Sequence, residues 1–165
     1  MINQTPHAGD AIRISQVARQ LLESGSIGDE LMRHSAIVLI PLPVRAPGGA
    51  LHSWFVPITV GDRLVAFFQF LPDGTLMRFS SFHRRPGEFA DCPVAADWLD
   101  QGRIQARAEI QCRRNETSSE PFLTYDRTPD RLVWAVPLTR AGGEVRHIYV
   151  AGETVYAPTP EGTFG

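Results

Sequence analysis

The stretch Trp54-Phe55-Val56-Pro57-Ile58-Thr59 returns 80 positions later as Trp134-Ala135-Val136-Pro137-Leu138-Thr139. The residues after each copy are also alike: a glycine turn, an apolar run, a second turn and a further strand-like segment. Self-similarity at a fixed offset constrains the architecture before any single residue is interpreted. Two copies are too few for a solenoid. The repeat therefore predicts a tandem domain or one pseudo-symmetric domain.

The composition is that of a globular protein with one domain or two small ones. The chain has 165 residues, of which 43% are hydrophobic and 21% charged, ordinary values for such proteins. Its net charge is −2, which argues against a polyanion-binding surface, so we expect no nucleic-acid partner. All 16 basic residues are arginine. Schiff-base chemistry on a lysine and a P-loop lysine are therefore excluded.

The apolar runs are too short for a membrane span, which needs about 18 consecutive apolar residues or more. The N-terminus is polar and shows no apolar core of a signal peptide. We therefore expect no membrane span. The localisation stays open between cytoplasmic, for the chain as written, and extracytoplasmic, for a chain that is a mature form.

Hydrophobic periodicity predicts an α+β fold. Helical spacing of apolar residues covers 12–23 and 93–111, with a short helical turn at 29–34. Segment 36–44 is apolar, but its two prolines restrict it to an edge strand or an extended segment, and 113–120 is polar and loop-like. Strands are expected at 51–60, 63–71, 75–82, 122–126, 131–139, 144–150 and 154–158.

These elements predict two tandem repeats, each a helical region followed by a small antiparallel β-meander. The repeats cover 1–85 and 93–165, and 86–92 is the linker. The strand at 63–71 is apolar on both faces, so it should be buried on both faces. We expect the second face to be covered by the other repeat or by another molecule.

The second copy resembles the closing hairpins of PepSY domains. The similarity lies in the apolar strand around Trp134, the Gly142-Gly143 turn and the strand that runs into Ala151-Gly152-Glu153. The first copy has a matching turn at Asp73-Gly74. PepSY domains pair a helix with a short antiparallel sheet and occur in peptidase propeptides and bacterial envelope proteins. The resemblance implies binding or inhibition, and it supplies no catalytic residue.

The residues with catalytic or metal-binding chemistry show no spacing typical of such sites. The two cysteines, Cys92 and Cys112, flank the predicted helix, whose length of about 30 Å would keep them from forming a disulfide unless the helix breaks at Gly102. Cys92 before a helix start suggests a nucleophile, although such a cysteine is far more often a packing residue and Asp91 opposes a thiolate. We therefore expect no catalytic residue, no metal and no cofactor. The histidines, none of which has metal-ligand spacing, are His7, His34, His52, His83 and His147.

A few residues are candidates for binding. His83-Arg84-Arg85 would suit a carboxylate or phosphate, or would form a solvated loop. Trp54 and Trp134 are either core anchors or aromatic walls of a groove. Tyr149 lies on a late strand, where a part-exposed aromatic residue often marks a partner-binding face.

The leading hypothesis is a non-catalytic protein-binding module: an inhibitor, an assembly factor or an accessory subunit. It would bind a protein partner, or associate with itself, through a sheet face or edge. The alternative is a small-molecule-binding protein or small enzyme with a pocket between a helix and a curved sheet. In that case Trp54, Trp134, His52 and His147 would approach the cavity.

Overall fold

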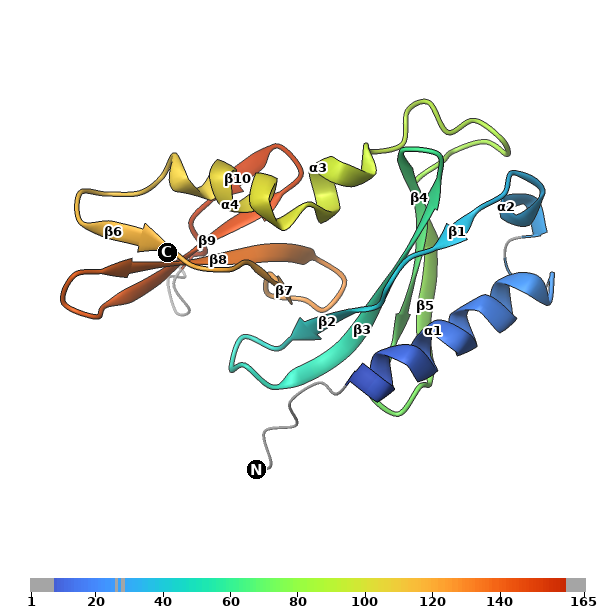
Figure 1. Ribbon diagram of the computed structural model, residues 1–165, viewed down its shortest axis with the longest axis horizontal. Coiled ribbons are helices and arrows are strands. Elements are labelled where there is room, and N and C mark those ends of the chain that lie inside the picture. Colours follow the sequence, from blue (N-terminus) through green and yellow to red (C-terminus); the bar gives the residue numbers. More distant parts are fainter. Residues whose placement is uncertain (1–7, 26, 28, 160–165) are drawn as a thin grey trace. The chain divides into compact units, whose positions relative to one another are not determined.

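The computed structural model describes residues 8–25, 27 and 29–159 (Figure 1). The chain divides into two compact units, Met1–Ala95 and Ala96–Gly165. We refer to them as the N-terminal unit and the C-terminal unit. No helix among the described residues is long and apolar enough to cross a membrane.

The described residues of the N-terminal unit form two helices and five strands. The ten-residue strand β3 forms antiparallel pairs along both of its edges. One edge pairs with β4, which continues to β5; the other edge pairs with β1 and then β2. The elements are α1 (Ala8–Glu23), α2 (Asp29–Arg33), β1 (Ile37–Val38), β2 (Leu42–Arg45), β3 (Leu51–Val60), β4 (Arg63–Phe70) and β5 (Leu76–Ser81).

The C-terminal unit arranges its strands in the same way. The long strand β8 pairs with β9 on one edge and with β6 and β7 on the other, and β9 pairs with β10. The elements are α3 (Ala95–Leu99), α4 (Gln101–Glu109), β6 (Glu116–Ser118), β7 (Phe122–Tyr125), β8 (Leu132–Arg140), β9 (Val145–Ala151) and β10 (Thr154–Tyr156).

The offset of 80 in the sequence also holds for the strand pairing. Trp54 lies opposite Phe70 in the first unit, and Trp134 lies opposite Val150 in the second. The interruption between β1 and β2 also has a counterpart between β6 and β7. Leu39 N donates to Pro57 O at 2.9 Å, and Ser119 N donates to Pro137 O at 3.0 Å. The sequence repeat therefore corresponds to two units whose strands pair in the same register.

The predicted fold class is wrong as stated, because the units are not helical regions followed by small meanders. The described residues form ten strands and four short helices, so β-structure dominates. Segment 36–44, expected as an edge strand or an extended segment, forms β1 and most of β2, whereas 113–120, expected as a loop, contains β6; the edges of β3 and β8 offer these segments backbone hydrogen bonds. No local pattern in a short segment reveals a distant strand edge.

The predicted single helix over 93–111 is also wrong. It is divided into α3 and α4 at Asp100, whose carboxylate accepts a hydrogen bond from Arg103 N at 3.1 Å and caps α4. A side-chain cap of this kind satisfies a backbone donor at the start of a new helix. The predicted domain boundaries at 85 and 93 stay a prediction. Cys92 nevertheless belongs to the buried cluster of the N-terminal unit.

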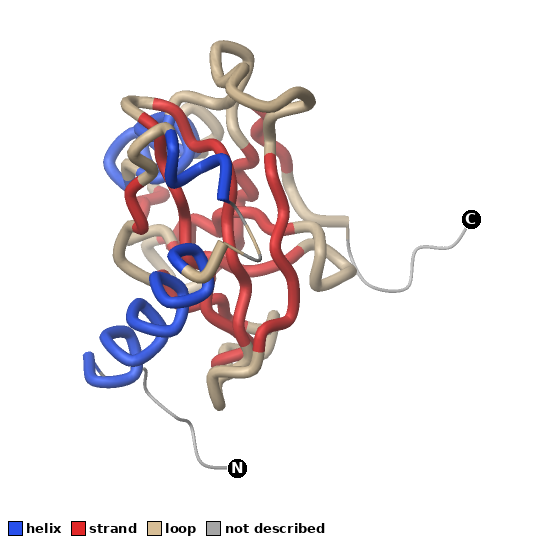
Figure 2. The backbone as a smooth tube through the Cα atoms, turned by 90° about the vertical axis from the view of Figure 1, so that its right-hand side faces the viewer, coloured by secondary structure: helices blue, strands red, loops and turns tan. Residues whose placement is uncertain are grey.

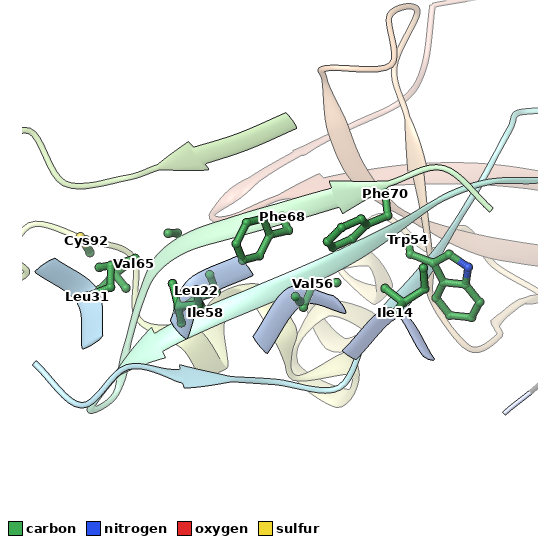
Figure 3. Packing of buried hydrophobic residues seen from close by; sticks show 12 residues of the cluster. Ile14, Leu22, Leu31, Trp54, Val56, Ile58, Val65, Phe68, Phe70 and Cys92 are labelled. Carbon is green, nitrogen blue, oxygen red and sulfur yellow. The ribbon is translucent and has the colours of Figure 1, made fainter. Parts of the chain in front are cut away.

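The core of the N-terminal unit lies between α1 and one face of the sheet (Figure 3). Ile14 lies beside Trp54 near one end of this core, and Leu22 lies beside Ile58. Each fully buried side chain of this size contributes about 1.5–3 kcal/mol. Strand β4 is buried on both faces, as its sequence predicts. On its second face Phe67 packs against Phe55, with ring centroids 4.9 Å apart.

The C-terminal unit holds its two helices against the turn between β9 and β10. Trp134 Nε1 donates to Trp98 O at 2.7 Å, and Arg107 Nη1 donates to Gly152 O at 2.8 Å. Gly152 has a φ of +60°, and a Cβ there would lie 3.2 Å from Cζ2 of Trp98. The absence of a side chain at this turn therefore lets the Trp98 ring approach the backbone.

Replacing Gly152 by alanine should lower the free energy of unfolding more than the same change at Gly143. Both glycines have positive φ, so each substitution costs about 1–2 kcal/mol for the left-handed backbone. Gly143 has no atom within 4 Å of a Cβ, whereas the clash at Gly152 adds about 1–3 kcal/mol. Urea unfolding of both variants measures the difference, and equal losses would contradict the contact.

Candidate functional site

The helix α1 and the segment 38–41 enclose an open groove of about 540 Å³ in the N-terminal unit. We call it the α1–β1 groove. One side is a stripe of α1 spaced at three and four residues, and the other is the end of β1 with the residues immediately after it. The described lining residues are Ala8, Ala11, Ile12, Ser15, Gln16, Arg19, Val38, Leu39, Ile40 and Pro41.

The groove results from the orientation that the core imposes on α1. Ile14, Ala18 and Leu22 are buried against the sheet. The neighbouring stripe of the helix is consequently turned toward β1 and solvent. Figure 2 shows α1 as the long helix nearest to the N-terminal end.

Two large apolar side chains of the groove are unusually exposed to solvent. Ile12 is 60% exposed and Ile40 is 78% exposed. Single exposed apolar residues are common, but a contiguous apolar patch usually marks a binding surface. Here the two isoleucines lie on the two sides of one groove.

The groove also borders a strand edge. Leu39 N bonds to Pro57 O on β3, and hydrogen-bonded residues alternate along an antiparallel pair. The backbone groups of Val38 and Ile40 therefore point away from β3. Among the described residues, β1 pairs with β3 alone, so its outer edge has no strand partner there. An extended peptide recognises such an edge by adding a strand.

Charge is sparse in the groove. Among the described residues that line it, Arg19 alone is charged. Arg13, on another side of the same helix, donates to Pro72 O at 3.1 Å and lies 3.8 Å from the Asp10 carboxylate. Arg19 makes no such contact within the described part of the chain.

The two tryptophans lie in the cores. Trp54 is 2% exposed and Trp134 is 3% exposed, and neither is among the residues that line the groove. Trp134 Nε1 bonds to Trp98 O, whereas the buried Nε1 of Trp54 has no hydrogen-bond partner among the residues described. Their placement agrees with the interpretation as core anchors.

His83 lies against α2, whereas Arg84 and Arg85 are exposed. His83 Nε2 is 3.8 Å from Glu30 Oε2, and its ring meets Phe89 edge to face with centroids 5.3 Å apart. His83 therefore faces a carboxylate of the protein itself. Binding of an anion by these three residues stays a prediction.

Tyr149 lies in an aromatic pair on the last strands. Its ring meets Tyr156 edge to face at a centroid distance of 5.8 Å. The Tyr156 hydroxyl donates to Asp126 Oδ2 at 2.7 Å. Burial, followed by this hydrogen bond, raises the pKa of Tyr156 to about 12, and burial raises the pKa of Tyr149. A role of Tyr149 in binding stays a prediction.

Both cysteines are free, although the unbroken helix on which that expectation depended is divided at Asp100. Cys92 is buried in the apolar cluster, and burial raises the pKa of its thiol, which disfavours a nucleophilic thiolate. In the part of the chain that the structure describes, no three His, Cys, Asp or Glu residues are placed to hold a metal ion. His7 lies outside the described residues.

The sequence offered one signal for the groove. Segment 36–44 is almost entirely apolar, although an edge strand usually carries charges that discourage pairing with other chains. Ile12, by contrast, lies among the other apolar residues of α1, and its exposure depends on how the helix is rotated against the sheet.

The chain matches no family model, no curated protein and no solved structure. The resemblance to PepSY domains stays a prediction.

Replacing Asp126 by asparagine should lower the pKa of Tyr156 from about 12 toward its usual value near 10. The substitution removes the carboxylate that opposes formation of a tyrosinate. NMR titration of ring-labelled tyrosine measures the pKa, and Tyr156→Phe identifies the signal. An unchanged pKa in the Asp126→Asn variant would contradict the contribution of Asp126, which comes second to burial.

The same pKa shift determines the direction in which the stability of the fold changes with pH. The folded pKa of Tyr156 lies above the unfolded value. The stability that Tyr156 contributes through this shift is therefore fully present below about pH 10 and is lost as the pH rises through about 12. Above pH 10 the wild-type chain should lose more unfolding free energy than the Tyr156→Phe variant.

Proposed function

We propose that this protein is a non-catalytic protein-binding module, an inhibitor, assembly factor or accessory subunit, that binds an extended segment of a partner along the α1–β1 groove. The observation that carries this proposal is the combination of an open strand edge with an exposed apolar groove. Main-chain hydrogen bonds to the outer edge of Val38 and Ile40 would supply affinity. The apolar lining would select side chains at alternate positions of the added strand.

The C-terminal unit provides a comparison within the same chain. Position 118 corresponds to position 38 through the offset of 80. Gln105 Nε2 donates to Ser118 Oγ at 2.8 Å, and Ser118 Oγ donates to Glu109 Oε1 at 2.6 Å. These bonds join α4 to β6 directly. The apolar Val38 makes no such bond to α1, which favours a groove for binding in the N-terminal unit alone.

The resemblance to PepSY domains points in the same direction, since it implies binding or inhibition. The alternative, a small-molecule pocket or a small enzyme, draws some support from the groove volume, which lies in the usual range for ligand sites. The residues expected to approach such a pocket, Trp54, Trp134, His52 and His147, are not among those lining the groove. The protein-binding function is therefore preferred.

Charged substitutions in the groove should weaken peptide binding. We would screen acetylated, amidated peptides of about five to seven residues, the length of a typical strand. Ile12→Asp and Ile40→Asp should each weaken the selected peptides at least about tenfold, because each removes an apolar contact worth about 1.5–3 kcal/mol. Fluorescence polarisation measures the dissociation constants.

Ile110→Asp is the matched control, since Ile110 is 83% exposed in the C-terminal unit. This variant should bind like the wild type, and all three variants should unfold at similar urea concentrations. The proposal fails if no peptide binds, or if Ile110→Asp weakens binding as much as the groove variants do.

A further inference from the structure

We propose that the segment bound in the α1–β1 groove is an extended apolar stretch of a partner protein with an acidic side chain at its C-terminal end, paired with Arg19. This inference rests on the proposed function and specifies the chemistry of the partner.

The position of Arg19 along the groove is fixed by the core. Ile14 of α1 lies beside Trp54, and Leu22 lies beside Ile58 (Figure 3). In the sheet, Trp54 pairs with Pro43 and Ile58 pairs with Val38. Later residues of α1 therefore lie beside earlier residues of the strand, and Figure 1 shows the two running in opposite directions. Arg19 is consequently at the Val38 end of the groove, and Ala8 is at the Pro41 end.

The length and direction of the occupant are set by this placement. The lining stripe from Ala8 to Arg19 spans about 16 Å of helix, which an extended chain covers in about five residues. Antiparallel pairing is slightly more stable than parallel pairing. A strand antiparallel to β1 would run from Pro41 toward Val38, so its C-terminal end would arrive at Arg19.

Arg19, the charged residue at that end, has no ion-pair partner in the part of the chain that the structure describes. Glu23 lies one helical turn beyond Arg19, and within the described residues the two form no ion pair. The remainder of the described lining carries no charge and is mainly apolar. A guanidinium binds a carboxylate through paired hydrogen bonds. The complementary occupant is therefore apolar along most of its length and acidic at one end.

The experiment uses the full chain and acetylated, amidated peptides of about five residues, the length that the groove accommodates. The peptides alternate valine or isoleucine with threonine and end in Glu, Gln or Lys. Amidation removes the charge of the terminal carboxylate. Any difference in affinity between the peptides therefore comes from the side chain of the last residue. Fluorescence polarisation compares the wild type with Arg19→Glu and with the control Arg84→Glu, which reverses an exposed arginine in the same unit.

The wild type and Arg84→Glu should bind the Glu peptide about two- to fivefold more tightly than the Gln peptide, the range expected for an exposed ion pair. The Lys peptide should bind most weakly. Arg19→Glu should reverse this order, and added salt should reduce the preference.

Four outcomes would overturn the inference. If all three peptides bind wild type equally, the groove takes apolar segments without the acidic preference, and the proposed function stands alone. If none binds, both proposals fail. If oleate displaces the peptides, or if sedimentation shows that the groove is occupied by a second copy of the chain, the occupant is not an acidic partner segment.

Discussion

The constraint on which the rest of the structure depends is the use of both edges of the long strand in each unit. Strand β3 pairs with β4 on one edge and with β1 and β2 on the other. This register turns Trp54, Val56 and Ile58 toward α1. A slip by one residue would place all three on the opposite face, and the core on which α1 rests would be lost.

The groove is a consequence of two fixed orientations. The buried stripe of α1 sets the rotation of the helix, and the hydrogen bond from Leu39 to Pro57 sets which backbone groups of the adjoining strand face outward. Neither orientation depends on Ile12 or Ile40. These side chains remain exposed although hydrophobic, since nothing in the core requires them.

The two units share a strand register but differ in chemistry. In the C-terminal unit the contacts around β6 are polar. Ser118 joins β6 to α4, and Arg146 Nε donates to Glu116 Oε2 at 2.7 Å. This hydrogen bond is the main reason why the pKa of Glu116 is lowered. In the N-terminal unit the corresponding strand is apolar, and it borders a groove that α1 lines on the other side. A common framework thus supports a helix joined to its strand by side-chain hydrogen bonds in one unit and an apolar groove between helix and strand in the other.

The sequence by itself determined the local elements and the repeat. The expected strands at 51–60 and 63–71 are β3 and β4, and the helix expected at 12–23 is the larger part of α1. Alternation and helical spacing reveal these elements because each pattern is completed by neighbours in the chain. The tertiary structure alone decided between the edge strand and the extended segment left open at 36–44, and it decided that β6 is a strand and that α3 and α4 are separate. It also decided that Ile12, Arg19 and Ile40 line one groove. Those outcomes depend on hydrogen bonds and packing between distant segments, which leave no mark on local periodicity.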